Sequence, residues 1–512
     1  MRCFKLLLLG LLTGSLGSSP VHSRDFFLTI GGGYSPQGNQ ASLEANVLFF
    51  QRLLSTKQLT TSTHKIYFAD GFDGGHDLQV LERPDDKPAP AVKALSDIFR
   101  FTANDKLFYR NHQVSNISGG NRAADIREGL KSIGSQLAAG DRLFVYVTAH
   151  GGPARGKDSL NTSITCWGNK ALAMTEFSSW LDELPTEIIV VSVMAQCYCG
   201  GFANTIFQAG DDTLGFAQNV RCGFFAQQAD LPAAGCRPDV ENDEEYSSYF
   251  WGAFLGSSRT GKGVGTVDCN NDGRVSLAEA HAYAVLASET TDIPLRSSET
   301  ILRRYSQIAG YDIGPKRRPR DVDAEETDTT SKDNLAFLTG TVYDIAARGR
   351  PEETCIIVGL AEKLGISVSS EVGEVINQYE SQRNELRFGT RRARGPSTRR
   401  KVQAAVIEKW PELEDPKSWS SAEVLRPENQ VTFLAELEQL EGYSQALKSI
   451  QERAKARKAS VEAELKQVKF RRLIQQLENV VLGQNIARVA EADVIKRYSE
   501  VIAAEEGFLS VK

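Results

Sequence analysis

The sequence lacks an excess of positive charge. Its 512 residues contain 59 Lys and Arg against 65 Asp and Glu, which gives a formal net charge of −6 and a pI of about 5.8. Nucleic-acid binding needs a strongly basic surface, so this charge balance argues against a nucleic-acid partner. Hydrophobic residues at 41% and charged residues at 24% are ordinary for a globular protein. The length predicts roughly two to four domains.

Apart from its amino terminus, the chain also lacks an apolar run long enough to cross a bilayer, so we expect no transmembrane span. It has no dinucleotide fingerprint, because Gly31–Gly33 follow a strand-like run without the required spacing. A second glycine-rich stretch, Asp70–His76, carries acidic groups that suggest a phosphate or metal site, but its spacing fits no phosphate-binding pattern. We interpret Asp70–His76 as an ordinary polar loop.

Residues 1–23 have the layout of a secretory signal peptide: a positive start, the apolar stretch Leu6–Leu16, and small residues before Arg24. This predicts export to the periplasm or the outside of the cell. The mature chain then keeps seven cysteines, an odd number, which implies at least one free thiol. They are Cys166, Cys197, Cys199, Cys222, Cys236, Cys269 and Cys355.

Short apolar strands alternate with helical patterns over residues 24–315, which predicts one α/β domain with a mostly parallel sheet flanked by helices. Two of the strand-like runs are Leu143–Val147 and Ile188–Val193. His150 follows the first run and Cys197 follows the second. Because loops after parallel strands meet at one edge of the sheet, we expect His150 and Cys197 to share that edge.

A histidine and a cysteine placed together suit acyl transfer. The imidazole removes the thiol proton and later delivers it to the leaving group. Gly151 lets backbone approach a substrate, and its N–H with that of Cys197 is expected to hold the oxyanion. Other interpretations stay open: His150 as an ordinary loop residue, and Cys197 and Cys199 as disulfide partners, a redox pair or half of a zinc site.

Together, the strand followed by His150-Gly151 and the strand followed by Cys197-Tyr198-Cys199-Gly200 resemble caspase-like cysteine peptidases of the legumain type. The resemblance covers about residues 26–306 and implies a caspase/haemoglobinase-like fold, peptide-bond hydrolysis and Cys197 as the nucleophile. The simple signal favours a bacterial member. The position two before the nucleophile is Ala195, where legumains have an acidic residue, so their substrate preference does not carry over.

The resemblance also implies substrate-binding roles for Asn39 and Gln40, which lie in a stretch similar to the legumain specificity pocket.

A twelve-residue stretch at 268–279 fits the EF-hand calcium loop, with Gly273 at its sharp turn. The alternative is a turn capped by its aspartates. We expect no cofactor for the chemistry itself and a structural Ca²⁺ here. The predicted ligands are Asp268, Asn270, Asp272, the Arg274 carbonyl, Ser276 and Glu279.

Composition changes at a charged linker over residues 316–332, and residues 333–512 are mostly helix-forming. Leucines and isoleucines between Leu437 and Leu477 recur at helical spacing among many charges, which predicts a long amphipathic hairpin or short coiled coil. We expect these helices to mediate self-association of the protein.

These patterns favour an exported cysteine endopeptidase that acts on peptide or protein substrates through a Cys-His dyad and an acyl-enzyme. The alternative is a catalytically degenerate caspase-like scaffold whose helical tail recruits a partner.

Overall fold

The computed structural model describes residues 23–59, 62–82, 88–101, 106–235, 245–265, 267–313, 335–389 and 398–509. Three expectations concern residues outside this set. They are the signal peptide, of which only residue 23 is described, Cys236, and the charged linker at 316–332.

A mostly parallel sheet forms the centre of the α/β body, in the order β2-β1-β5-β8-β9, and the short β10 adds an antiparallel edge beside β9. Its central strands are continuous apolar runs buried on both faces, as a parallel sheet covered by helices requires. This confirms the predicted sheet. The strands are β1 (Asp25–Gly32), β2 (His64–Phe68), β5 (Arg142–Gly152), β8 (Ile189–Met194), β9 (Val220–Phe225) and β10 (Leu295–Arg296).

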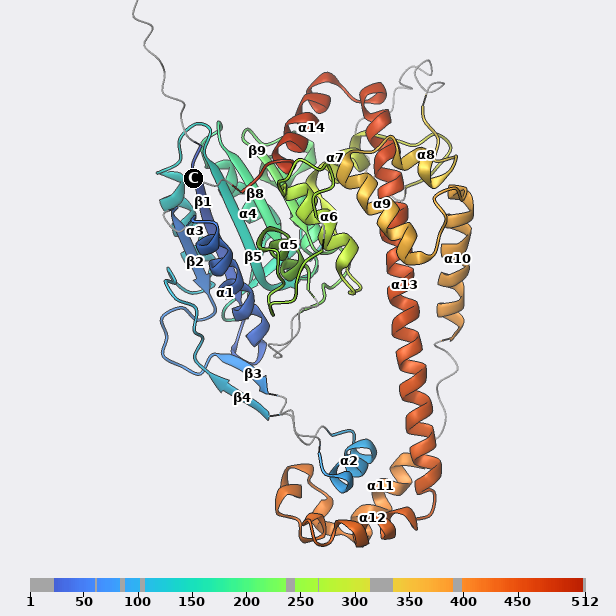
Figure 1. Ribbon diagram of the computed structural model, residues 1–512. Helices are drawn as coiled ribbons and strands as arrows, with labels where there is room; N and C mark the ends of the chain where they lie inside the picture. Colours follow the sequence, from blue (N-terminus) through green and yellow to red (C-terminus); the bar gives the residue numbers. More distant parts are fainter. Residues whose placement is uncertain are drawn as a thin grey trace, which may run out of the picture.

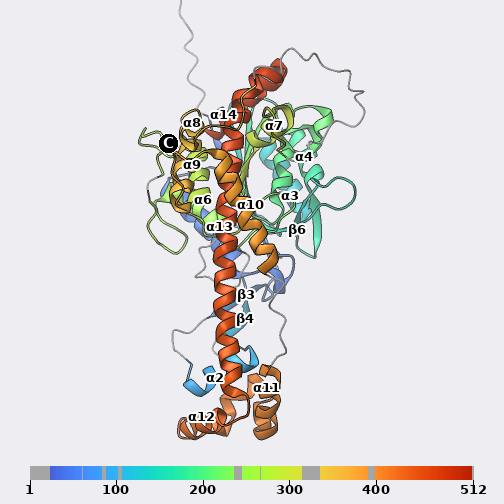
Figure 2. The same ribbon diagram turned by 90° about the vertical axis from the view of Figure 1, so that its right-hand side faces the viewer.

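Helices cover both faces of the sheet. On one side lie α1 (Ala41–Thr56), α5 (Tyr246–Leu255) and α6 (Leu277–Ala287), and on the other lie α3 (Ala123–Gly134) and α4 (Met174–Asp182) (Figures 1 and 2). The aromatic residues of α5 fill the interior, because the Phe250 and Trp251 side chains are fully buried.

Short elements surround the sheet. The hairpin of β6 and β7 extends from the end of β5, and β3 pairs with β4 in a separate two-stranded sheet. Their bounds are β3 (Leu78–Glu82), β4 (Lys106–Arg110), β6 (Ser163–Cys166) and β7 (Lys170–Ala173). The 3₁₀ turns here are η1 (Pro36–Gly38), η2 (Cys199–Ile206), η3 (Gln208–Gly210) and η4 (Asp212–Leu214).

The C-terminal region is helical, as predicted, but of the two expected arrangements, a long hairpin or a short coiled coil, the hairpin is wrong. One continuous helix of 47 residues, α13 (Tyr443–Val489), takes its place. The sequence has no glycine or proline from 443 to 482, so nothing in it breaks the helix. The other helices that pack on the main body are α7 (Ser297–Tyr305), α8 (Val342–Ala346), α9 (Pro351–Leu364), α10 (Val372–Gly389) and α14 (Ala492–Glu505).

Helix α13 joins two apolar cores. Its C-terminal half contributes Leu473, Leu477 and Val481 to the core of the α/β body, whereas residues 451–462 are exposed along their length (Figure 1). Its first turns enter a second core with α2, which comes from the N-terminal part of the chain. This second core is built from α2 (Pro90–Phe99), α11 (Thr398–Lys409), η7 (Pro411–Leu413), η8 (Pro416–Ser421), η9 (Glu423–Leu425) and α12 (Gln430–Glu438).

Within the described residues, every helix is too short or too polar to serve as a membrane span.

Candidate active site

The loops after β5 and β8 meet at one edge of the sheet. These strands are parallel neighbours, with Val145 of β5 beside Ser192 of β8. His150 lies near the end of β5, and Cys197 follows β8 by three residues. The carboxyl-end edge of the sheet therefore carries both residues, as the order of motifs along the sequence predicted.

Gly151 makes the closest approach between the two loops. A Cβ built on Gly151 would overlap the backbone carbonyl of Cys197 and would lie 2.9 Å from Cγ of Gln196. Only glycine permits this contact, because every other residue would push the loops apart. The residue after the histidine is thus in direct backbone contact with the cysteine.

The imidazole of His150 is held through Nε2. This nitrogen lies 2.8 Å from the Gly38 carbonyl oxygen and 2.8 Å from Gln40 Oε1. The Gln40 amide nitrogen donates to the Gln37 carbonyl at 3.3 Å, which leaves Oε1 as the atom that faces the ring. Since both partners of Nε2 are acceptors, the neutral ring carries its proton on Nε2, and Nδ1 keeps the lone pair. Burial lowers the pKa of His150, which favours this neutral form.

The Cys197 thiol is partly exposed and unbonded to another sulfur. It donates to the Ala233 carbonyl at 3.6 Å. Burial raises the pKa of the Cys197 thiol, and the nearby Asp292 charge raises it further. The two pKa shifts both favour the uncharged forms of the imidazole and the thiol. A neutral thiol has to lose its proton to a base before its sulfur can attack.

The rest of the cysteine motif shapes the loop. Tyr198 has φ 61° and ψ 16°, a left-handed turn directly after Cys197 that non-glycine residues rarely adopt. Gly200 lets the next loop approach, because a Cβ there would lie 2.7 Å from the Gln227 carbonyl oxygen. The Cys199 thiol is fully buried and donates to that same carbonyl oxygen at 3.5 Å. Cys197 and Cys199 are both free thiols.

Asn39 and Gln40 make contacts within the protein that the sequence did not predict, and their expected substrate-binding role stays a prediction. Asn39 is fully buried, accepts from the Gly33 N–H at 2.9 Å and donates to the Asp77 carbonyl at 3.0 Å. Gln40 is partly buried, and its Oε1 contacts His150 Nε2. Gln40 thus ties the segment 33–40 to His150 near the end of β5, and Asn39 ties the same segment to Asp77.

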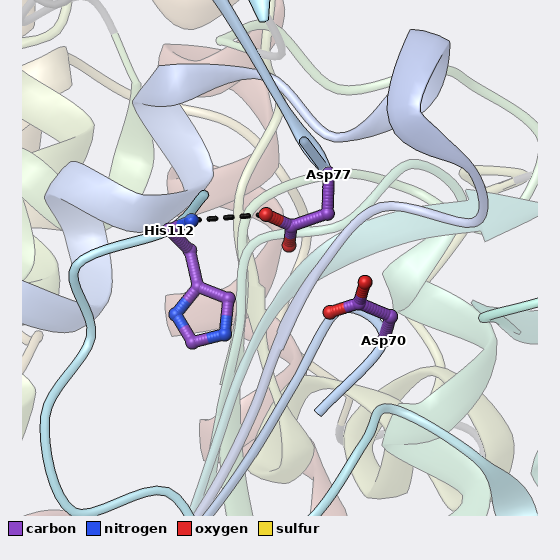
Figure 3. A group of neighbouring side chains, drawn as sticks. All are labelled: Asp70, Asp77 and His112. Carbon is purple, nitrogen blue, oxygen red and sulfur yellow. Dashed lines mark hydrogen bonds between the residues drawn. The ribbon is translucent and has the colours of Figure 1, made fainter. Parts of the chain in front are cut away.

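Three side chains of types that can ligate a metal, Asp70, Asp77 and His112, form a group that the sequence did not predict. Their ligand atoms lie within 4.8 Å of one another (Figure 3). It is the one such group of three or more His, Cys, Asp or Glu residues in the described part of the chain. The acidic loop Asp70–His76 is the one signal of this group in the sequence, and its spacing alone predicts a plain loop, since Asp77 lies just past it and His112 lies 35 residues beyond Asp77.

In the expected calcium loop at 268–279, the acidic side chains accept hydrogen bonds from the loop's own backbone. Asp268 accepts from the backbone of Asp272 and Gly273, and Gly273 has φ 79°. The Glu279 carboxylate, however, accepts from the N–H groups of Cys269 and Ser276 in a capping box that begins α6. Calcium binding stays a prediction that requires Glu279 to exchange these partners for the ion. The other expected ligands, Asn270, Arg274 and Ser276, lie on the same loop.

Comparisons with known proteins identify no family. No protein-family model matches the chain, and no curated protein matches it. Among solved structures, the fold search matches protein GSU0716 from Geobacter sulfurreducens, with a TM-score of 0.24 and 8% identity. The match covers 41% of this chain and 76% of that chain. A similarity of this level carries no argument about function.

Proposed function

We propose that this chain is a caspase-like cysteine endopeptidase of the legumain type, with Cys197 as the nucleophile and His150 as the general base and acid. The observation that carries the proposal is the backbone contact between Gly151 and Cys197, which joins the histidine loop to the cysteine loop. Two strand-end loops in contact, one with a braced imidazole and one with a partly exposed thiol, fit acyl transfer.

The proposed steps follow from the atoms that remain available. Nδ1 of His150 accepts the Cys197 proton, since Nε2 is bonded to Gly38 and Gln40. The sulfur attacks the peptide carbonyl, and the N–H groups of Gly151 and Cys197 stabilise the oxyanion. The imidazolium then protonates the leaving amine. Water, deprotonated by the same imidazole, hydrolyses the thioester and restores the thiol.

Export to the periplasm or beyond is part of the proposal, because a signal peptide at residues 1–23 would release a mature chain that begins near Arg24. Amino-terminal sequencing of protein secreted from an expression host tests it. A chain that keeps residues 1–23 contradicts export.

The test of the activity is labelling and cleavage by the mature chain. A library of peptide acyloxymethyl ketones should modify Cys197 stoichiometrically, and a mixed peptide library should be cut. Cys197→Ala should lower cleavage by about 10³-fold or more. Cys269→Ala is the matched control, because Cys269 is also a partly exposed thiol outside the proposed dyad, and it should leave both readouts unchanged.

Absence of both labelling and cutting would overturn the peptidase proposal and favour the scaffold alternative, in which the helical region recruits a partner. Analytical ultracentrifugation of the same preparation tests self-association through the C-terminal helices.

A further inference from the structure

Three segments bring Asp70, Asp77 and His112 together beside the segment that holds His150. Asp70 follows β2, Asp77 precedes β3, and His112 follows β4. Figure 3 shows the two carboxylates and the imidazole turned toward a common centre. The three side chains are therefore brought together by the folding of separate segments and not by their spacing in the sequence.

Both carboxylates are deeply buried, and Asp70 has an oxygen without a hydrogen-bond partner. Asp70 is 5% exposed and Asp77 is 2% exposed. Asp70 Oδ1 is buried without a hydrogen-bond partner, whereas Asp77 Oδ1 accepts from the His112 backbone N–H at 2.9 Å. Leaving a buried carboxylate oxygen unpaired costs free energy, so this oxygen points to a ligand at the centre of the cluster.

Basic side chains near the cluster have other partners. Arg110 donates to the Glu44 carboxylate through both terminal nitrogens. Arg122 pairs with Asp73 on the surface at 3.1 Å. The facing charges of Asp70 and Asp77 thus have no described cation bonded to them, and a divalent ion would neutralise both.

We propose that Asp70, Asp77 and His112 bind a divalent transition-metal cation, Zn²⁺ or Mn²⁺. Nε2 of His112 faces the two carboxylates and donates to the Gly71 carbonyl oxygen at 3.1 Å, a hydrogen bond that a bound ion would replace (Figure 3). An imidazole among the ligands favours a transition metal over Ca²⁺ or Mg²⁺, which prefer oxygen alone.

Asp70 also lines a cavity of ≈ 390 Å³, whose other charged residues are Arg122, Asp73, Asp125 and Glu128. The net charge of this lining is negative, which attracts cations to the side of Asp70.

The cation site is connected to the proposed base, a step that rests on the proposed function. Asn39 Nδ2 donates to Asp77 Oδ2 at 3.2 Å and to the Asp77 backbone carbonyl. The neighbours of Asn39 in sequence, Gly38 and Gln40, supply the two acceptors for His150 Nε2. An ion that fixes Asp77 therefore stiffens the segment that orients the imidazole.

Equilibrium dialysis of the full mature chain against Zn²⁺, Mn²⁺, Ca²⁺ or Mg²⁺, with metal counted by mass spectrometry, tests the site directly. Wild-type protein should bind Zn²⁺ or Mn²⁺, and Asp70→Asn should weaken that binding at least tenfold. His112→Gln is the second variant, should Asp70→Asn fail to fold. Asp268→Asn is the control, since it changes the calcium-type loop and should keep the site intact.

Equal Zn²⁺ and Mn²⁺ binding by wild type, Asp70→Asn and His112→Gln would overturn the proposal, as would a wild type that binds neither ion. The connection to His150 is read from the alkylation rate of Cys197 with and without the ion. Addition of the ion should change the alkylation rate of Cys197 in wild type and leave it unchanged in His112→Gln. Dialysis needs no peptidase activity, so failure of the proposed function leaves this test decisive.

Discussion

Gly151 lies against the backbone carbonyl of Cys197, so closely that a Cβ would overlap it. Gly151→Ala should therefore separate the two loops. Overpacking of this kind costs about 1–3 kcal/mol of unfolding free energy. Labelling of Cys197 by peptide acyloxymethyl ketones should also decrease in Gly151→Ala, because displacement of the Cys197 carbonyl moves the thiol of the same residue.

The matched control for this substitution is Gly263→Ala. Gly263 has no atom within 4 Å of the added Cβ and does not have a positive φ. Urea unfolding and mass-resolved labelling of both variants give the comparison. A Gly151→Ala protein with wild-type stability and labelling would contradict the contact.

The strands that position His150 and Cys197 were predictable, because continuous apolar runs such as Ile188–Val193 have few other stable arrangements. The location of both residues at one edge of the sheet then follows, because β5 and β8 are parallel neighbours. The functions of Asn39 and Gln40 were not predictable, since their partners Asp77 and His150 lie 38 and 110 residues away. Sequence spacing carries no information about such contacts.

The C-terminal region shows the same limit. Helical periodicity indicated the helices, but a repeat of leucines does not distinguish a hairpin from one long helix. Nor did it indicate that Pro90–Phe99, far earlier in the chain, packs with the first turns of α13. The group of Asp70, Asp77 and His112 was not predictable for a related reason, because Asp70 and His112 belong to separate segments of the chain.

The neutral resting state of the dyad predicts an alkaline reactivity profile. Burial raises the pKa of Cys197 and lowers that of His150. At neutral pH the thiolate fraction is thus smaller than for a free cysteine, and it grows as pH rises. Alkylation of Cys197 by iodoacetamide should keep increasing about tenfold per pH unit up to pH 9.

Peptide-resolved mass spectrometry of timed samples follows Cys197 alone, with Cys197→Ser as the blank. A plateau between pH 5 and 8 would instead reveal a thiolate-imidazolium pair at rest.

The contact between Gln40 and His150 gives a substitution with a defined sign. In Gln40→Glu a carboxylate faces Nε2, which favours the imidazolium and raises the pKa of His150. A nearby positive charge in turn lowers the pKa of the thiol. Cys197 alkylation at pH 7 should therefore rise by about tenfold, the equivalent of one pKa unit.

Gln40→Leu removes the same hydrogen bond without adding charge, so it should give no increase. Identical alkylation rates at pH 7 for Gln40→Glu and wild type would show that Gln40 does not influence the dyad.

Arg472 ties helix α13 to the loop beside the cysteine. Its guanidinium is buried and donates to the backbone carbonyls of Asp292, Val285, Ser288 and Thr290 at 2.8–3.0 Å. Asp292 Oδ1 in turn accepts from the Ala234 N–H at 2.8 Å, next to the carbonyl that Cys197 contacts.

Arg472→Met should destabilise the protein by about 3–5 kcal/mol, because it leaves several buried carbonyls unpaired. Labelling of Cys197 should change in the fraction that stays folded, since the 288–294 loop loses its anchor. Arg453→Met on the exposed stretch of α13 is the control for the loss of one arginine and should cost less than about 0.5 kcal/mol. Arg472→Lys keeps the charge but not the planar fork, so its stability should fall between the two. Urea unfolding measures all three, and equal midpoints for Arg472→Met and Arg453→Met would mean that α13 does not brace the site.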